Sequence, residues 1–178
     1  MLKRVGITAT LLTVALLMSA APAWAAITTT TNPANAPTGT HLQTGTIGCA
    51  VDPATNLVTC SAYELAGVGN ANASATLVAA YSATVQCRNH GGQIVEVKSQ
   101  TTSAPRSTGT IRPKNGRLDV PSLTSGPVPT DADFEANATC PNGNWTKETL
   151  DSTVTLSSFT YTLSFTGFSG PYITITGP

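Results

Sequence analysis

Alternation of apolar and polar side chains with a period of two is the feature that most constrains this 178-residue chain. Between Leu77 and Gln86 every odd position is apolar, and the same holds between Phe159 and Thr166. Successive side chains of a β-strand point to opposite faces of the sheet, so this period predicts strands with one buried face. Beyond the first 25 residues no stretch has a convincing helical period. The chain is therefore expected to be all-β.

Strand-like segments recur at short intervals with turn residues between them, and Asn115-Gly116 is the strongest hairpin turn. About ten short strands with few helices predict an antiparallel β-sandwich, immunoglobulin-like or jelly-roll-like, with a β-barrel as the alternative. Hydrophobic residues make up 40% of the chain, which suffices for a core. The predicted strands are 46–52, 57–66, 74–88, 93–99, 108–112, 117–120, 134–140, 146–156, 159–166 and 172–176.

The first 25 residues have the pattern of a secretory signal peptide. Lys3 and Arg4 precede an apolar run over 5–17, and small residues flank Trp24 at a cleavage site after Ala25. The apolar run is shorter than the roughly 20 residues that span a bilayer. We therefore expect a secreted protein with no membrane span after signal cleavage.

The remaining chain is predicted to have two parts. Residues 26–45 are rich in threonine and proline and show neither strand nor helix periodicity, which predicts a flexible lead-in. Residues 46–178 are then expected to form a single β-sandwich domain.

Four cysteines remain after the signal peptide, and an even number in an exported protein predicts disulfides. In a hairpin around residues 53–56, Cys49 lies opposite Cys60 and Val51 opposite Val58, all on one face. The second disulfide would then join Cys87 and Cys140, which share parity with the apolar positions of their predicted strands. The spacing of the cysteines does not suit a zinc site.

The charge balance argues against nucleic acid as a partner. Charged residues make up 10% of the chain, with nine basic and nine acidic side chains. A nucleic-acid-binding protein needs a basic face that replaces the counterions of the phosphates.

Three stretches together resemble a loose group of secreted proteins common in actinomycetes, to which no activity is assigned. They are residues 63–70 (YELAGVGN), 87–92 (CRNHGG) and 140–146 (CPNGNWT). The middle stretch of that group usually reads Cys-x-Asn-Pro-Gly-Gly, and His90 replaces the proline here. The resemblance covers the chain from about Cys49 onward and implies a secreted all-β domain. It implies no catalytic residue.

Candidate residues for catalysis or metal binding are few. We therefore expect that the protein is not an enzyme and that it binds neither a cofactor nor a metal. His90 follows Cys87 at a Gly-Gly turn and is interpreted as a turn residue, since all thiols are assigned to disulfides. Asp131, Asp133 and Glu135 form the one acidic cluster, with a weak calcium site as the alternative to a solvated strand face.

Trp145 is the first candidate for ligand contact, because it is the only tryptophan after the signal peptide. Asn142 and Asn144, which precede it, are its hydrogen-bonding neighbours in a sugar-binding site, with Tyr63 and Tyr172 as weaker candidates. In the alternative interpretation Trp145 packs on the second disulfide as part of the core.

These observations predict a secreted non-catalytic β-sandwich, either an envelope-associated structural protein or a binding module. Its expected partner is cell-wall polysaccharide or an extracellular protein. The alternative is a secreted inhibitor or carrier of a soluble protein, which would present the Ser/Gly/Pro-rich loop 121–129 as a rigid, exposed element.

Overall fold

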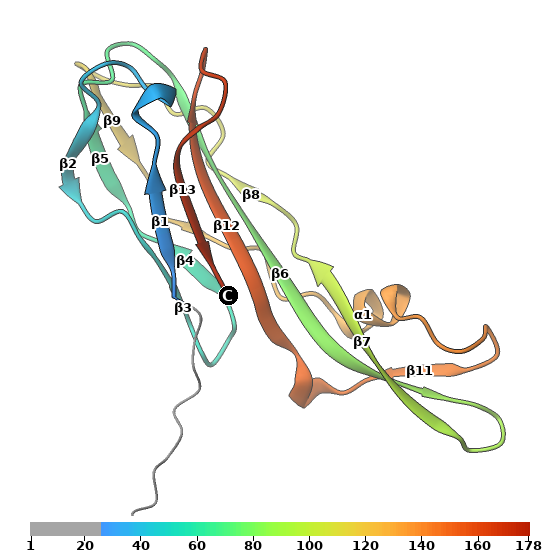
Figure 1. Ribbon diagram of the computed structural model, residues 1–178. Helices are drawn as coiled ribbons and strands as arrows, with labels where there is room; N and C mark the ends of the chain where they lie inside the picture. Colours follow the sequence, from blue (N-terminus) through green and yellow to red (C-terminus); the bar gives the residue numbers. More distant parts are fainter. Residues whose placement is uncertain (1–25) are drawn as a thin grey trace, which may run out of the picture.

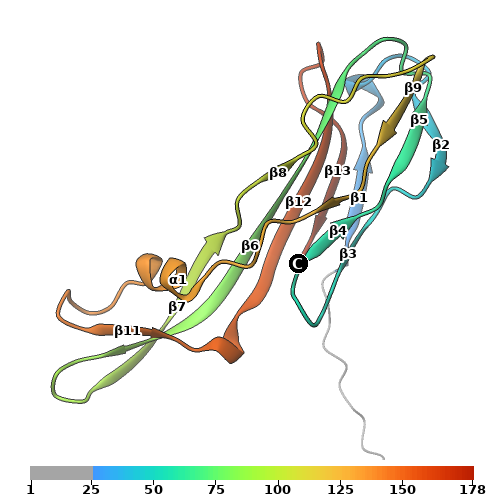
Figure 2. The same ribbon diagram turned by 180° about the vertical axis from the view of Figure 1, so that it is seen from behind.

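The computed structural model describes residues 26–178, which form antiparallel β-sheets (Figures 1 and 2). The predicted signal peptide lies outside the described residues. The largest sheet has seven strands and contains both segments with strict alternation. In spatial order it comprises β1 (Thr28–Thr31), β13 (Pro171–Gly177), β12 (Thr155–Phe165), β6 (Ala73–Arg88) and β11 (Thr146–Thr149), with β7 (Ile94–Thr102) and β8 (Arg106–Ser107) also paired to β6.

Two smaller sheets of three strands each pack against the large sheet. One consists of β2 (His41–Gly45), β5 (Tyr63–Ala66) and β9 (Arg117–Val120), the other of β3 (Cys49–Val51), β4 (Val58–Cys60) and β10 (Leu123–Thr124). Buried residues from all three sheets form one hydrophobic core. The predicted antiparallel sandwich is confirmed, and the barrel alternative is wrong because the sheets end in unpaired edge strands.

The alternation in the sequence corresponds to the alternation of burial in the two central strands. Leu77, Tyr81 and Val85 on β6 are fully buried, and so is Leu163 on β12. The polar residues between them lie on the outer face, where threonine suits a pleated, half-exposed surface. Burying this apolar face against the small sheets is what holds the sandwich together.

The 16-residue strand β6 extends beyond the sandwich and forms the centre of a projecting arm. On one edge, β12 pairs with β6 as far as Ser82, and β11 takes its place from Val85 to Arg88. On the other edge, β7 pairs with β6 from Ala80 to Arg88. We call β6 from Ala80 to Arg88, β7, β11 and the helix α1 (Asp131–Asn137), which packs across them, the arm (Figure 1).

Residues 26–45 contain two paired strands, so the predicted flexible lead-in is wrong. β1 pairs with β13 over four residues, and β2 pairs with β5. A short 3-10 helix, η1 (Pro33–Asn35), lies between them. Every residue of the two strands is exposed, so backbone hydrogen bonds hold them and no apolar alternation marks them.

Three of the predicted strands differ in the structure. Residues 57–66 form two strands that belong to different sheets, β4 and β5. Residues 146–156 are divided by the 3-10 helix η2 (Asp151–Thr153) into β11 and the start of β12. Residues 108–112 contribute only a single bridge, between Ile111 and Ala73.

The predicted strand 134–140 is also wrong, because the helix α1 occupies most of it. A capping box begins the helix: the Asp133 carboxylate accepts hydrogen bonds from the backbone N–H and the hydroxyl of Thr130, both at 2.8 Å. Phe134 is the one residue of the helix that is buried.

Both predicted disulfides are present, Cys49–Cys60 and Cys87–Cys140. The first joins directly paired residues of β3 and β4, with Val51 opposite Val58 as predicted. The Asn115-Gly116 turn is confirmed as well, since both residues have a positive φ, 53° and 73°. Within residues 26–178, no helix is long and apolar enough to cross a membrane.

Candidate functional site

The outer end of the arm brings together two loops that are distant in sequence. One joins β6 to β7, and the other leads from the Cys87–Cys140 disulfide into β11. We call residues 89–92 and 141–145 the arm tip. The disulfide has a sequence separation of 53 and a Cα–Cα distance of 5.8 Å, and it lies two residues before Asn89 and two before Asn142. The covalent link therefore fixes the two loops against each other.

Trp145 lies between two surface hollows at the arm tip. It is half-buried and is not part of the hydrophobic core. One hollow, of about 250 Å³, is lined by Trp145 with Asn89, His90, Gly91, Asn142 and Asn144. The other, of about 340 Å³, is lined by Trp145 with Ala138, Thr139, Cys140, Asn142, Gly143 and Lys147. Trp145 and Asn142 therefore line both hollows.

Asn89 holds the β6–β7 loop in shape. Its side-chain oxygen accepts a hydrogen bond from the backbone N–H of Gln93 at 2.8 Å, and its Nδ2 donates to Gln93 Oε1 at 2.7 Å. Gly92 completes the turn with a φ of 80°, in the left-handed region that favours glycine. Because both polar atoms of the amide are used within the loop, Asn89 shapes the hollow and leaves ligand contact to its neighbours.

Three side chains at the hollow keep polar atoms available. Asn142 Oδ1 accepts a hydrogen bond from the backbone N–H of Asn144 at 3.1 Å, which fixes the second loop. Asn142 Nδ2, the Asn144 amide and the His90 ring have no hydrogen-bond partner among the described residues, and all three side chains are exposed. They can therefore donate to and accept from a ligand placed on Trp145.

Two cations, Lys147 in the lining of the second hollow and Arg88 just before the first loop, are engaged in contacts of their own. Lys147 Nζ donates to the backbone oxygen of Glu135 at 2.7 Å, and Arg88 Nη2 donates to Gln86 Oε1 at 3.3 Å. The first hollow carries no carboxylate, lysine or arginine in its lining. An aromatic surface with neutral donors and acceptors suits an uncharged, hydroxyl-rich ligand.

The structure brings together Trp145, Asn142 and Asn144, the three residues that the sequence predicts for ligand contact. It separates the two weaker candidates from them: Tyr63 and Tyr172 are buried in the sandwich. The interpretation of Trp145 as part of the core does not hold.

Asn89, His90 and Gly91 also line the hollow, although the sequence pattern marks them only as a turn. The predicted disulfide is the feature of the sequence that could have identified these three residues as part of the site. A bridge between Cys87 and Cys140 requires that the residues just after each cysteine lie close together.

The acidic residues Asp131, Asp133 and Glu135 lie on helix α1, and not on the strand that the sequence predicts. In helix α1 the carboxylate of Asp133 caps Thr130, while Glu135 Oε1 accepts a hydrogen bond from the backbone N–H of Thr149 at 3.1 Å. Desolvation, with the nearby carboxylate of Asp151, raises the pKa of Asp131. Among the residues that the structure describes, no three His, Cys, Asp or Glu side chains are placed to hold a metal ion.

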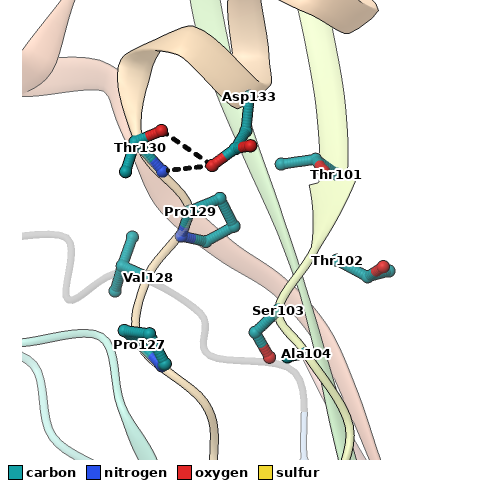
Figure 3. Close-up of a pocket in the computed structure, with 9 residues that line it drawn as sticks. All are labelled: Thr101, Thr102, Ser103, Ala104, Pro127, Val128, Pro129, Thr130 and Asp133. Carbon is teal, nitrogen blue, oxygen red and sulfur yellow. Dashed lines mark hydrogen bonds between the residues drawn. The ribbon is translucent and has the colours of Figure 1, made fainter.

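A further hollow of about 240 Å³ lies where the arm meets the sandwich (Figure 3). The end of β7 and the two residues after it, 101–104, form one side, and residues 127–130 with Asp133 form the other. Its one charged group, Asp133, is already bound to Thr130, as the dashed lines show. This hollow offers no aromatic surface and is a weaker candidate than the arm tip.

The loop 121–129 does not stand out from the sandwich. Leu123 and Thr124 form β10 against β4, and Ser125 is buried with its Oγ accepting a hydrogen bond from the backbone N–H of Val58 at 3.2 Å. The exposed, projecting loop that an inhibitor would need is therefore absent at the predicted position.

Comparisons with protein families, with curated proteins and with solved structures found no match to this chain.

Proposed function

We propose that this chain is a secreted, non-catalytic glycan-binding protein, and that the arm tip binds uncharged sugar residues of an extracellular polysaccharide such as that of the cell wall. The observation that carries the proposal is the position of Trp145 between two hollows, beside polar atoms of His90, Asn142 and Asn144 that have no partner among the described residues.

The chemistry of a sugar ring supports this assignment. A pyranose has an apolar face of C–H groups, which stacks on an aromatic ring, and a rim of hydroxyls, which pair with amides and imidazole. Trp145 supplies the first kind of contact, and the neutral side chains around it supply the second. The open hollows suit one or two residues of a chain that continues into solvent.

The rigidity of the arm tip supports the proposal as well. The disulfide Cys87–Cys140 and the hydrogen bonds within each loop fix the site before a ligand arrives. A preformed site loses less conformational entropy on binding, which favours affinity for a small contact area. Two disulfides also fit the oxidising environment outside the cell that the signal peptide predicts.

Co-sedimentation with washed, insoluble cell-wall polysaccharide tests the proposal, using the chain from Ala26 onward. The wild-type protein is expected to pellet with the polysaccharide. Trp145→Ala is expected to weaken binding at least about tenfold, as the loss of a central aromatic contact typically does.

Phe168→Ala is the matched control for that experiment. Phe168 is an exposed aromatic in the turn between β12 and β13, at the end of the molecule away from the arm (Figure 2), and it is 37% exposed. It should pellet like the wild type. Equal pelleting of the wild type and Trp145→Ala would contradict the proposed site, and no pelleting of the wild type would contradict the proposed class of ligand.

A further inference from the structure

One long edge of the arm has no partner strand. β7 pairs with β6 on one side, and no described strand pairs with its other side. The register is continuous from Arg88–Ile94 to Ala80–Thr102, and the next residue, Ser103, donates its N–H to the oxygen of Ala79. Because backbone groups alternate in direction along an antiparallel pair, odd residues of β7 bond to β6. The N–H and C=O groups of the even residues 94–102 therefore point away from the sheet.

Helix α1 covers a face of this strand and leaves its edge open. Ser99 Oγ donates to the backbone oxygen of Phe134 at 2.6 Å, so the odd side chains of β7 face the helix. The even side chains, which include Glu96 and Lys98, lie exposed on the opposite face, where Lys98 Nζ also donates a hydrogen bond to Thr84 Oγ1 at 2.8 Å. Ile94 and Val95 are 47% and 40% exposed, an unusual exposure for large apolar side chains in an ordered strand.

We propose that the free edge of β7 pairs antiparallel with the same edge of a second copy of this chain, centred on Val97. The proposal does not depend on the glycan-binding function. A strand with unpaired backbone groups is a template for another strand, and a two-fold axis through Val97 would extend the arm sheet across both copies.

Backbone geometry restricts the registers of such a pair. Only even residues point their backbone groups outward, so each even residue must lie opposite an even residue of the second copy. The two-fold axis must therefore pass through a residue and not between two residues. The central choices are Glu96, Val97 and Lys98.

Charge selects one register among these three. With the axis at Val97, Glu96 lies opposite the partner's Lys98, and Lys98 lies opposite the partner's Glu96. With the axis at Glu96, two glutamates face each other, and with the axis at Lys98, two lysines do. Opposite charges across a strand pair stabilise it and like charges destabilise it, so only the axis at Val97 is complementary.

The arrangement fits the overall shape. Figures 1 and 2 show the arm projecting from the sandwich, so antiparallel arms would place the two sandwiches at opposite ends of the dimer. A single pair of strands buries less surface than a standard interface. The dimer is therefore expected to be weak and to dissociate on dilution.

Sedimentation equilibrium over a concentration series up to about 1 mM, a range suited to weak association, tests the proposal with the chain from Ala26 onward. The variants are Glu96→Lys, Lys98→Glu and the double exchange Glu96→Lys/Lys98→Glu. Each single variant creates two like-charge pairs and is expected to weaken dimerisation by about tenfold or more. The double exchange restores both opposite-charge pairs and should dimerise like the wild type.

The double exchange also separates pairing from folding, since it carries both substitutions and should still form dimers. A wild type that stays monomeric at every concentration would overturn the proposal. A dimer that both single variants form as well as the wild type would overturn it too, because the interface would then lie elsewhere. A single variant that loses its near-ultraviolet circular dichroism is not folded and would be replaced by the neutral variant Glu96→Gln or Lys98→Gln. Each neutral variant removes both opposite-charge pairs and should weaken the dimer, and an unchanged dimer would again overturn the proposal.

Discussion

Two tyrosine hydroxyls meet inside the sandwich, one from each facing sheet. Tyr63 Oη on β5 and Tyr161 Oη on β12 are 2.9 Å apart, and both side chains are buried. Burial raises the pKa of both hydroxyls above the ordinary value of 10.0. The pair is the one direct side-chain hydrogen bond between these two strands within the described part of the chain. Removing either hydroxyl therefore tests how the two sheets pack against each other.

Replacing one of the two tyrosines by phenylalanine is expected to leave the other hydroxyl buried and unpaired. Tyr63→Phe and Tyr161→Phe should each lower the free energy of unfolding by about 1–3 kcal/mol, measured by urea denaturation. The double variant removes both polar groups and should lose less than the sum of the single losses. Additive losses would show that the two hydroxyls are not coupled.

The same pair predicts loss of stability at alkaline pH. In the folded protein both pKa values are raised, so the hydroxyls stay protonated while those of the unfolded chain ionise above pH 10. The stabilisation is complete below pH 10 and decreases as the pH rises further, by about 1.4 kcal/mol per pH unit for each such tyrosine. Urea denaturation between pH 9 and 11 measures the slope. The variant Tyr63→Phe/Tyr161→Phe should have a flatter dependence, and an equal slope would contradict this origin.

Part of the candidate site could be predicted from residue types alone. A single tryptophan preceded by Asn142 and Asn144 was the pattern that marked the site, and the structure places the three together. Asn89 and His90 join them because the Cys87–Cys140 disulfide and the pairing of β11 with β6 bring the two loops together. The predicted disulfide pointed to that approach, whereas the residue pattern of either loop alone carries no information about the other loop.

Strands with a buried face could be predicted from the sequence, whereas strands held mainly by backbone hydrogen bonds could not. The central strands β6 and β12 have one buried face, and their alternation was visible. The edge strands β1 and β2 are exposed on both faces, so any polar sequence of suitable propensity fits them. In α1, acidic residues alternate with apolar ones over too few positions to distinguish a strand from two turns of helix.

The disulfide between Cys87 and Cys140 is expected to stabilise both the fold and the arm tip. Replacing both cysteines by alanine removes a link that closes a loop with a sequence separation of 53. The loss should be about 4 kcal/mol in urea denaturation, if the disulfide acts mainly on the entropy of the unfolded chain. Binding of polysaccharide should weaken as well, since the two loops are no longer tied together.

The corresponding change at Cys49 and Cys60 serves as its control. That disulfide closes a shorter loop, with a sequence separation of 11, and its loss should cost about 3 kcal/mol. It lies in the sandwich and has no contact with the arm tip, so binding should be retained wherever the variant is folded. Equal loss of binding in both variants would show that binding depends on overall stability and not on the arm tip.

Charged residues are expected to contribute little to the proposed binding of polysaccharide. Lys3 and Arg4 lie in the predicted signal peptide, so the rest of the chain carries seven basic and nine acidic residues. The first hollow at Trp145 has no charged lining residue. Salt screens charge interactions but leaves stacking and neutral hydrogen bonds largely intact. The amount of protein bound to polysaccharide should therefore stay constant between low and high sodium chloride, and a steep decrease would indicate an electrostatic site.

The measurement that tests the central claim most directly is a fluorescence titration of the chain from Ala26 onward. Trp145 is the only tryptophan in that part of the sequence, so the indole emission reports on the arm tip alone. Soluble fragments of a neutral cell-wall polysaccharide should change the intensity of the emission and shift it to shorter wavelength, because the sugar displaces water from the half-buried indole. Both changes should saturate as the fragment concentration rises. Asn144→Ala should require a higher fragment concentration for the same change. An emission spectrum that stays constant at fragment concentrations at which co-sedimentation shows binding would contradict the claim, because the glycan would then bind at another surface.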